Sequence, residues 1–253
     1  LVVNASNIEK DFNWILTQNK DFNATIIDES NNYSLLAIQG PKAIDYCQKF
    51  TDVELNKMKN FTHSISKFAN CNDIILSKTG YTGSGGLEIY IPNKDAINIW
   101  DALFKSNSNE LLMPIGLAAR DTLRIEMGYC LYGNDINENT SPIEAGLGWI
   151  TKPETECIGF EIFQDQIING VKKKLVGFKL KGRGIPRAGY RIFDSNDTEI
   201  GITTSGTFSP VLKKGIGLGY LEFDSLVTYR DMFIKIRDEF IELEIIKPPF
   251  IEI

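Results

Sequence analysis

Residues 80–90 read Gly-Tyr-Thr-Gly-Ser-Gly-Gly-Leu-Glu-Ile-Tyr, and this stretch predicts a tight turn followed by a strand. In the strand, Leu87 and Ile89 face one way, while Glu88 and Tyr90 face the other. A carboxylate can accept two parallel hydrogen bonds from a ring N–H and an adjacent amino group, and an aromatic side chain can lie on the ring face. The stretch therefore suits recognition of a flat polar heterocycle. The alternative is a hairpin with a solvated glutamate on its open face.

A second informative segment, residues 118–128, predicts a helix that ends at Gly128. Arg120 and Arg124 are four residues apart and share one face of that helix. Two guanidinium groups on one face can bind a carboxylate. The alternative is that they are solvated or pair with a neighbouring Asp or Glu. A long polar loop over residues 131–149 follows, and loops of this length inside a domain are usually functional or mobile.

Composition excludes several classes of protein. The 253 residues are 43% hydrophobic and 24% charged, which is typical of a soluble globular protein of one large or two ordinary domains. A net charge of −6 gives nucleic-acid binding no electrostatic support. No apolar run approaches the roughly 20 residues that cross a membrane. Four cysteines without a C-x-x-C pair and one histidine, His63, offer no metal-ligand cluster and make a Ser-His-Asp mechanism improbable.

The chain divides near residue 153 in its pattern of elements. Before it, the pattern predicts an α+β arrangement, with helices at 8–19, 42–50 and 96–105 and strands at 35–39, 65–68 and 73–78. After Pro153 and a short stretch at 159–165, the pattern becomes all-β and predicts a small barrel or sandwich. Its strands are expected at 175–180, 189–193, 199–205, 216–221, 232–236 and 240–246. The expected domains are therefore 1–153 and 154–253.

Several runs, in order along nearly the whole chain, resemble the T-protein of the glycine cleavage system, the tetrahydrofolate-dependent aminomethyltransferase. They are Gly80-Tyr81-Thr82-Gly83 with Leu87-Glu88-Ile89, Gly116-Leu117-Ala118-Ala119-Arg120-Asp121-Thr122-Leu123-Arg124, Cys130-Leu131-Tyr132-Gly133-Asn134-Asp135-Ile136 and Thr204-Ser205-Gly206-Thr207-Phe208-Ser209-Pro210. The resemblance implies an α+β folate-binding half, incomplete at its N-terminus, followed by a small C-terminal β-barrel.

The resemblance also assigns roles to single residues. Glu88 resembles the carboxylate that pairs with the ring N–H and amino group of the pterin, and Tyr81 resembles an aromatic of the pterin pocket. Arg120 resembles the basic residue that binds the folate ligand, and Asn4 an amide near the reacting nitrogens. Phe61 stands where relatives often have an aromatic near the folate, although core packing explains it equally well.

Members of the family carry roughly a hundred further residues on the N-terminal side of the position of Leu1. That segment includes an aspartate held to be central to catalysis. We therefore expect no catalytic residue within these 253 residues, and we expect the 253 residues alone to be inactive.

The reaction implied by the resemblance is one-carbon transfer. An aminomethyl group on the lipoyl arm of a partner, the H-protein, loses ammonia, and its methylene passes to tetrahydrofolate, which serves as cosubstrate without a metal. The protein would act by holding folate and arm together, with a carboxylate assisting departure of ammonia. Frequent Asn, Ile and Lys indicate an AT-rich genome and favour a bacterial cytoplasm over a mitochondrial matrix.

Three alternatives remain. Folate-binding relatives in iron–sulfur protein assembly share the fold but show a Lys-Gly-Cys-Tyr-x-Gly-Gln-Glu stretch, where this chain has Tyr132-Gly133-Asn134-Asp135. The folate domains of dimethylglycine and sarcosine oxidising enzymes and related demethylases differ by attached flavin domains or by loop sequence. A non-catalytic protein with a lectin-like barrel would account for residues 154–253 alone.

Overall fold

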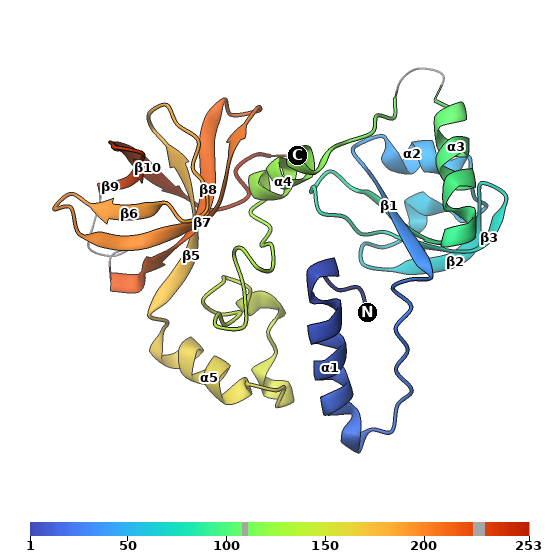
Figure 1. Cartoon of the computed structure of the whole chain (residues 1–253), viewed down its shortest axis with the longest axis horizontal. Helices are drawn as coiled ribbons and strands as arrows, with labels where there is room; N and C mark the ends of the chain where they lie inside the picture. The colour runs from blue at the N-terminus through green and yellow to red at the C-terminus, as the bar shows by residue number, and fades with distance from the viewer. Residues whose placement is uncertain (108–110, 225–230, 253) are drawn as a thin grey trace. The chain divides into compact units, whose positions relative to one another are not determined.

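The computed structural model describes residues 1–107, 111–224 and 231–252 and divides into two compact units, Leu1–Pro114 and Ile115–Ile253 (Figure 1). The division at Pro114 lies earlier in the chain than the change of sequence pattern near residue 153. Residues 115–153 therefore belong to the same compact unit as the strands that follow them. The predicted domains, 1–153 and 154–253, are units of sequence pattern, and a division by compactness does not test them. They stay a prediction.

The first unit contains a four-stranded antiparallel sheet in the order β1-β4-β3-β2. The strands are β1 (Tyr33–Gln39), β2 (His63–Phe68), β3 (Cys71–Ser77) and β4 (Gly86–Pro92). The helices are α1 (Ile8–Gln18), α2 (Ala43–Gln48) and α3 (Ala96–Lys105). The helices and strands expected in this part of the chain are thus confirmed, with bounds that shift by two residues or fewer.

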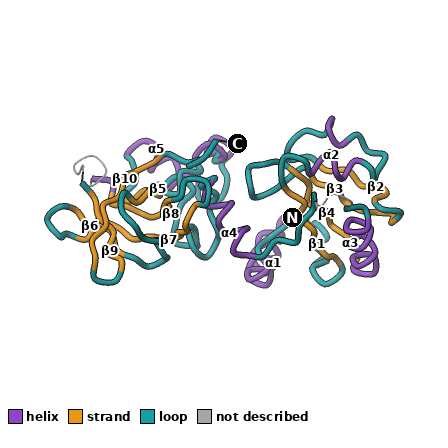
Figure 2. Tube along the Cα trace, turned by 90° about the horizontal axis from the view of Figure 1, so that it is seen from above, coloured by secondary structure: helices purple, strands orange, loops and turns teal. Residues whose placement is uncertain are grey.

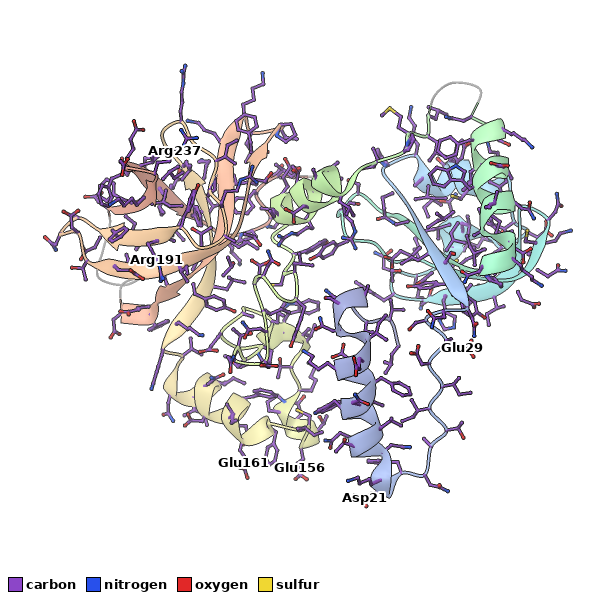
Figure 3. The ribbon with its side chains drawn as sticks, viewed as in Figure 1. Asp21, Glu29, Glu156, Glu161, Arg191 and Arg237 are labelled. Atoms are coloured by element: carbon purple, nitrogen blue, oxygen red, sulfur yellow. The ribbon has the colours of Figure 1, made fainter. Side chains whose placement is uncertain are left out.

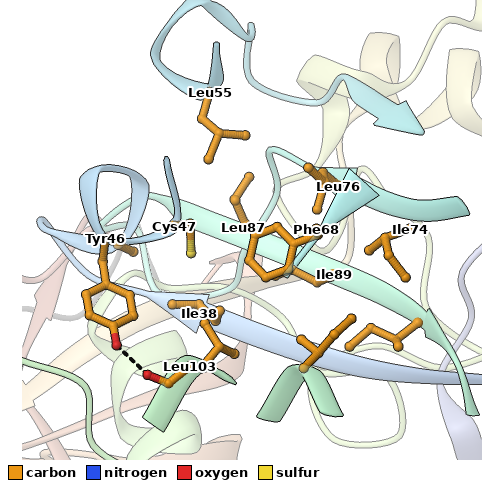
Figure 4. Close-up of a cluster of buried hydrophobic side chains, with 13 residues drawn as sticks. Ile38, Tyr46, Cys47, Leu55, Phe68, Ile74, Leu76, Leu87, Ile89 and Leu103 are labelled. Atoms are coloured by element: carbon orange, nitrogen blue, oxygen red, sulfur yellow. Dashed lines mark hydrogen bonds between the residues drawn. The ribbon is translucent and has the colours of Figure 1, made fainter. Parts of the chain in front are cut away.

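The core of the first unit lies between one face of this sheet and the helices α2 and α3 (Figure 4). Leu87, Ile89 and Ile91 of β4 are 0% exposed, as their alternation with polar residues predicts. Full burial of one such side chain stabilises the fold by about 1.5–3 kcal/mol. The hydroxyl of Tyr46 on α2 donates a 2.5 Å hydrogen bond to the carbonyl of Leu103 on α3 and ties the two helices together.

The second unit contains a closed six-stranded antiparallel barrel in the order β10-β5-β8-β7-β6-β9 (Figure 2). Its strands are β5 (Lys173–Leu180), β6 (Arg191–Asp194), β7 (Glu199–Ser209), β8 (Lys214–Glu222), β9 (Met232–Ile236) and β10 (Glu239–Ile246). Of the barrel and the sandwich that the sequence left open, the structure is the barrel. Together with the first unit, this confirms the α+β class with a β-barrel in the C-terminal part.

Glycines in β8 allow the barrel to close around its large core residues. A Cβ at Gly217 would lie 2.6 Å from the ring of Phe178, which is 0% exposed on β5. Gly217 therefore leaves the space that Phe178 fills. On the outside of the barrel, Arg191 of β6 pairs with Glu199 of β7 at 2.7 Å (Figure 3). Because both side chains are about half exposed, this pair contributes less than about 1 kcal/mol.

The described part of the second unit also contains α4 (Leu117–Glu126), which is the expected helix, and α5 (Phe160–Asn169), which was not expected. Helix α5 occupies the stretch 159–165, for which the sequence predicted no secondary structure, and extends four residues beyond it, while the β-strands predicted after that stretch form the barrel. A short stretch of mixed apolar and polar residues is ambiguous between strand and helix, and residues 160–163, with Glu161 among three apolar residues, are of that kind. The glycines at 159 and 170, both with positive φ, mark the two ends of α5.

Candidate functional site

The turn between β3 and β4 is built around the side chain of Gln39 at the end of β1. The Gln39 amide nitrogen donates to the carbonyls of Thr79 and Leu87, both at 3.2 Å, so it joins the backbone on the two sides of the turn. A Cβ at Gly80 would lie 1.9 Å from Gln39 Oε1, and one at Gly86 would lie 2.9 Å from Gln39 Nε2. At Gly80 a Cβ would displace the Gln39 amide, whereas at Gly86 it would also meet the backbone, because the carbonyl oxygen of Ile38 lies only 2.2 Å away.

Glu88 lies two residues after that turn, on the face of β4 opposite to the buried Leu87 and Ile89, and it is half-buried. Thr79 Oγ1 donates a 2.5 Å hydrogen bond to Glu88 Oε2, and Thr79 Oγ1 lies 3.0 Å from Ser77 Oγ. Among the described residues, the other carboxylate oxygen, Oε1, has no hydrogen bond. The carboxylate is thus anchored through one oxygen and has acceptor capacity left on both oxygens.

The neighbours of Glu88 on this face of the sheet come from both adjacent strands. Ala37 of β1 and Ser77 of β3 are its cross-strand partners. Tyr90 follows on the same face, and its burial, with the charge of Glu88 as a second cause, raises the pKa of Tyr90 above its ordinary value. The expected combination of a carboxylate with a neighbouring aromatic is therefore present at this face.

Tyr81 lies in the same glycine-rich turn and is half-buried, next to Thr82, whose hydroxyl donates to Gln39 Oε1 at 3.3 Å. Asn4 is exposed near the start of the first unit, and its backbone carbonyl accepts a 2.8 Å hydrogen bond from the N–H of Asn7. Phe61 is 85% exposed, so core packing does not explain it. The roles of Tyr81 and Asn4 in ligand binding stay predictions.

The two arginines that the sequence predicted on one face of a helix, Arg120 and Arg124, have different surroundings in the second unit. Arg120 of α4 is exposed, whereas Arg124 of the same helix is 1% exposed. Arg124 Nε donates to Asp121 at 2.8 Å and Nη1 donates to Asp135 at 2.6 Å. Arg124 therefore follows the alternative in which an arginine pairs with nearby acids, and Arg120 alone is a candidate for ligand binding. Arg120 belongs to a different compact unit from Glu88, and their meeting at one ligand stays a prediction.

The ion pair of Arg124 and Asp135 is the centre of a buried polar network. Nη2 of Arg124 donates to Ser205 on β7 at 2.7 Å, while Asp135 accepts from the backbone of Leu131 at 2.9 Å and from Thr204 at 2.5 Å. Burial disfavours the charge of Arg124, but the charges of Asp135 and Asp121 outweigh it, so the pKa of Arg124 is raised. The network attaches α4 and the loop after it to the barrel.

Two further hydrogen bonds join α4 to β7. Thr122 Oγ1 lies 2.9 Å from Thr207 Oγ1, and the hydroxyl of Ser209 donates to Glu126 Oε1 at 2.5 Å. Glu126 is 1% and Ser209 is 0% exposed. The helix that carries Arg120 is therefore held on the barrel by polar contacts from residues 122, 124 and 126.

A hollow of about 490 Å³ on the barrel is lined by several cations, among them Lys181, Arg183, Lys213 and Lys214. Arg187 follows Arg183 by four residues and is exposed. Its Nη1 donates a 3.5 Å hydrogen bond to the carbonyl of Gly206. Lys181 of this hollow pairs with Glu242 on β10, so part of its positive charge is already compensated. Within residues 1–107, 111–224 and 231–252, no cluster of three or more His, Cys, Asp or Glu has metal-site geometry, and no helix meets the length and apolarity of a membrane span.

Sequence reasoning missed Gln39, Thr79 and Asp135. Gln39 acts on Thr79 and Leu87, which are 40 and 48 residues away, and no local pattern reveals such a contact. Thr79 directly precedes the glycine-rich turn at 80–86, so a hydroxyl close in sequence to the candidate carboxylate was the signal that could have revealed it.

The Glu88 carboxylate, held by Thr79, can accept hydrogen bonds from a planar group that carries adjacent N–H donors.

Known protein families match both parts of the chain. The family described as "GCVT N-terminal domain" matches residues 1–155, and that described as "Glycine cleavage T-protein C-terminal barrel domain" matches residues 173–252. The aminomethyltransferase of Flavobacterium psychrophilum is 50% identical over 250 residues, which are 99% of this chain and 69% of that protein. The aminomethyltransferase of Porphyromonas gingivalis is 48% identical over 253 residues, 70% of its length.

Among solved structures, the glycine cleavage system aminomethyltransferase T from Bartonella henselae superposes with a TM-score of 0.86 at 32% identity. That match covers 98% of this chain and 67% of the Bartonella chain. Three findings therefore agree on the family: the high identity, the two family descriptions in the expected order, and the shared fold. The chain therefore belongs to the glycine cleavage T-protein family of aminomethyltransferases.

Proposed function

We propose that this protein transfers the methylene of an aminomethyl group, carried on the lipoyl arm of H-protein, to tetrahydrofolate with release of ammonia. The observation that carries the proposal is the oriented carboxylate of Glu88 after the glycine-rich turn, in a chain 50% identical to an aminomethyltransferase. Tetrahydrofolate is the cosubstrate, and no resident metal takes part in the proposed reaction. The bacterial sources of the relatives support a bacterial cytoplasm as its location.

In this proposal, Glu88 accepts hydrogen bonds from the ring N–H and the amino group of the pterin. The half-buried setting of Glu88 strengthens those charge-assisted bonds relative to bonds made in water. Tyr81 contributes an aromatic surface to the same ring, Asn4 an amide near the reacting nitrogens, and Arg120 a charge for a carboxylate of the folate. These groups bind and orient, and their contribution to the rate is to hold folate and lipoyl arm in reacting geometry.

The experiment compares the complete natural protein with its Glu88→Gln variant. The complete protein should form methylenetetrahydrofolate from aminomethylated H-protein and tetrahydrofolate. Glu88→Gln should weaken tetrahydrofolate binding in calorimetry by about 1–3 kcal/mol, because the amide presents a donor where the pterin also presents donors. Glu29→Gln is a matched control, since Glu29 is an exposed glutamate of the same unit (Figure 3). Unchanged affinity in Glu88→Gln would exclude this role for Glu88, and absence of product would exclude the proposed reaction.

A further inference from the structure

We propose that Thr79 is a positioning residue that sets the orientation of the Glu88 carboxylate for ligand binding. The inference rests on the proposed function of Glu88. It adds a reason why Glu88 prefers ligands with a planar pair of N–H donors. The contact that supports it is the 2.5 Å hydrogen bond between Thr79 Oγ1 and Glu88 Oε2.

The direction of the hydrogen bonds follows from the number of protons. An ionised carboxylate only accepts, so Thr79 donates its single hydroxyl proton to Glu88. The 3.0 Å contact between the Thr79 and Ser77 hydroxyl oxygens must then have Ser77 as its donor. A chain of hydrogen bonds therefore runs from Ser77 through Thr79 to Glu88, and every proton in it has one place.

The backbone positions of Thr79 and Glu88 are fixed by the same side chain. Gln39 binds the carbonyl of Thr79 itself and the carbonyl of Leu87, the residue directly before Glu88. Its two amide protons match these two acceptors. The distance between the Thr79 hydroxyl and the Glu88 carboxylate is thus determined by the sheet and not by a free loop.

The consequence is a carboxylate whose rotation is restricted. With Oε2 held by Thr79, the plane of the carboxylate has one preferred orientation, and Oε1 together with the remaining lone pair of Oε2 is available to a ligand. A planar pair of N–H donors reaches both oxygens only when the carboxylate plane coincides with the plane of the donors, so a fixed orientation favours such ligands over single donors. Thr79 thereby contributes to selectivity without contacting the reacting atoms.

The test measures selectivity as well as affinity. Calorimetry on the complete natural protein compares tetrahydrofolate with an analogue that lacks the ring amino group, in wild type, Thr79→Val, Thr79→Ser and Glu88→Gln. Thr79→Val should weaken tetrahydrofolate binding about tenfold and reduce the preference for tetrahydrofolate over the analogue, because Glu88 can then rotate. Thr79→Ser retains the hydroxyl, so its tetrahydrofolate affinity and its preference for tetrahydrofolate should both lie within about twofold of the wild-type values.

Two controls separate positioning from a general structural effect. Thr17→Val removes another hydroxyl bond of the first unit, from Thr17 Oγ1 to the carbonyl of Asn13 at 2.9 Å, and should leave the preference unchanged. Ser77→Ala removes the hydroxyl that contacts Thr79 but leaves the Thr79–Glu88 hydrogen bond in place, so it should lower the preference less than Thr79→Val does. If Thr79→Val does not fold, Ser77→Ala and Thr79→Ala decide in its place.

The outcomes distinguish this inference from the proposed function. If Glu88→Gln weakens binding and Thr79→Val leaves the preference at its wild-type value, the positioning role is wrong and the function of Glu88 stands. If Glu88→Gln has no effect on binding, the function of Glu88 is wrong and the inference is wrong with it. Loss of preference in Thr79→Val with recovery in Thr79→Ser supports both.

Discussion

Arg124 Nη1 donates a 2.6 Å hydrogen bond to Asp135 Oδ2, and their side chains are 2% and 0% exposed. This buried pair joins α4 to the loop that follows it, and through Ser205 and Thr204 it reaches β7. Removal of Asp135 would leave the charge of Arg124 buried and uncompensated. The resulting loss of stability is much larger than the net stabilisation that the pair provides.

The Asp135→Ala variant should therefore lower the free energy of unfolding by about 3–5 kcal/mol. Urea denaturation followed by tryptophan fluorescence measures it. Asp121→Asn is the matched control, because Asp121 also binds Arg124 but its side chain is 47% exposed. The control should lose less than about 1 kcal/mol. Equal losses in the two variants would contradict the view that burial of the Asp135 contact determines its importance.

The two adjacent glycines at 85 and 86 should respond differently to alanine. Gly85 has a φ of +76° and open space around it, so Gly85→Ala should cost only the left-handed backbone strain of about 1 kcal/mol. Gly86 has a φ of +143°, and a Cβ there would lie 2.2 Å from the carbonyl oxygen of Ile38. Gly86→Ala should cost on the order of 3 kcal/mol. Thermal unfolding of the two variants measures the difference, and a smaller loss for Gly86→Ala would show that β1 and β4 can separate without cost.

Two thiols, the buried Cys47 and the half-buried Cys130, should make the protein less stable at alkaline pH. Burial raises the pKa of Cys47 to about 12 and that of Cys130 to about 11, from an ordinary value of 9.0. Above pH 9 the unfolded chain releases these protons while the folded chain retains them, so the folded state loses stability as the pH rises from about 9 towards 12. Each thiol contributes a slope of up to about 1.4 kcal/mol per pH unit.

The measurement is the free energy of unfolding at several values of pH from 8 to 11, in wild type and in Cys130→Ala. The variant should lose less stability over this interval than the wild type, because one of the two titrating groups is absent. Parallel pH profiles for the two proteins would mean that Cys130 ionises as readily in the folded protein as in the unfolded chain.

Replacement of Arg120 should affect folate binding and leave folding intact. Arg120 is exposed, so Arg120→Gln should not change the midpoint of thermal unfolding. If its guanidinium binds a folate carboxylate, tetrahydrofolate affinity should fall by about 1.5–3 kcal/mol in calorimetry. Arg183→Gln, at an exposed arginine of the barrel, should leave that affinity unchanged. An unchanged affinity in Arg120→Gln would remove Arg120 from the proposed site.

The sequence alone determined those features that depend on local periodicity. The alternation of Leu87, Glu88 and Ile89 predicted which side of β4 is buried, and the structure confirms it because the period of two follows from strand geometry itself. The helix that carries Arg120 was expected for the same reason. The helix α5 was not predicted because its ten residues have no decisive period, and none of them is buried in the structure.

Only the tertiary structure decided the features that depend on contacts between distant residues. Arg120 and Arg124 are equivalent in the local pattern, and Asp135 and Ser205 make them different, because burial of one guanidinium requires acceptors that other elements supply. Closure of the barrel likewise depends on β5 pairing with β10 over more than sixty residues of chain, as in Leu180 and Leu243. The anchoring of Glu88 requires Gln39 from another strand. A local pattern specifies which face a side chain occupies, whereas its partners depend on where the rest of the chain folds.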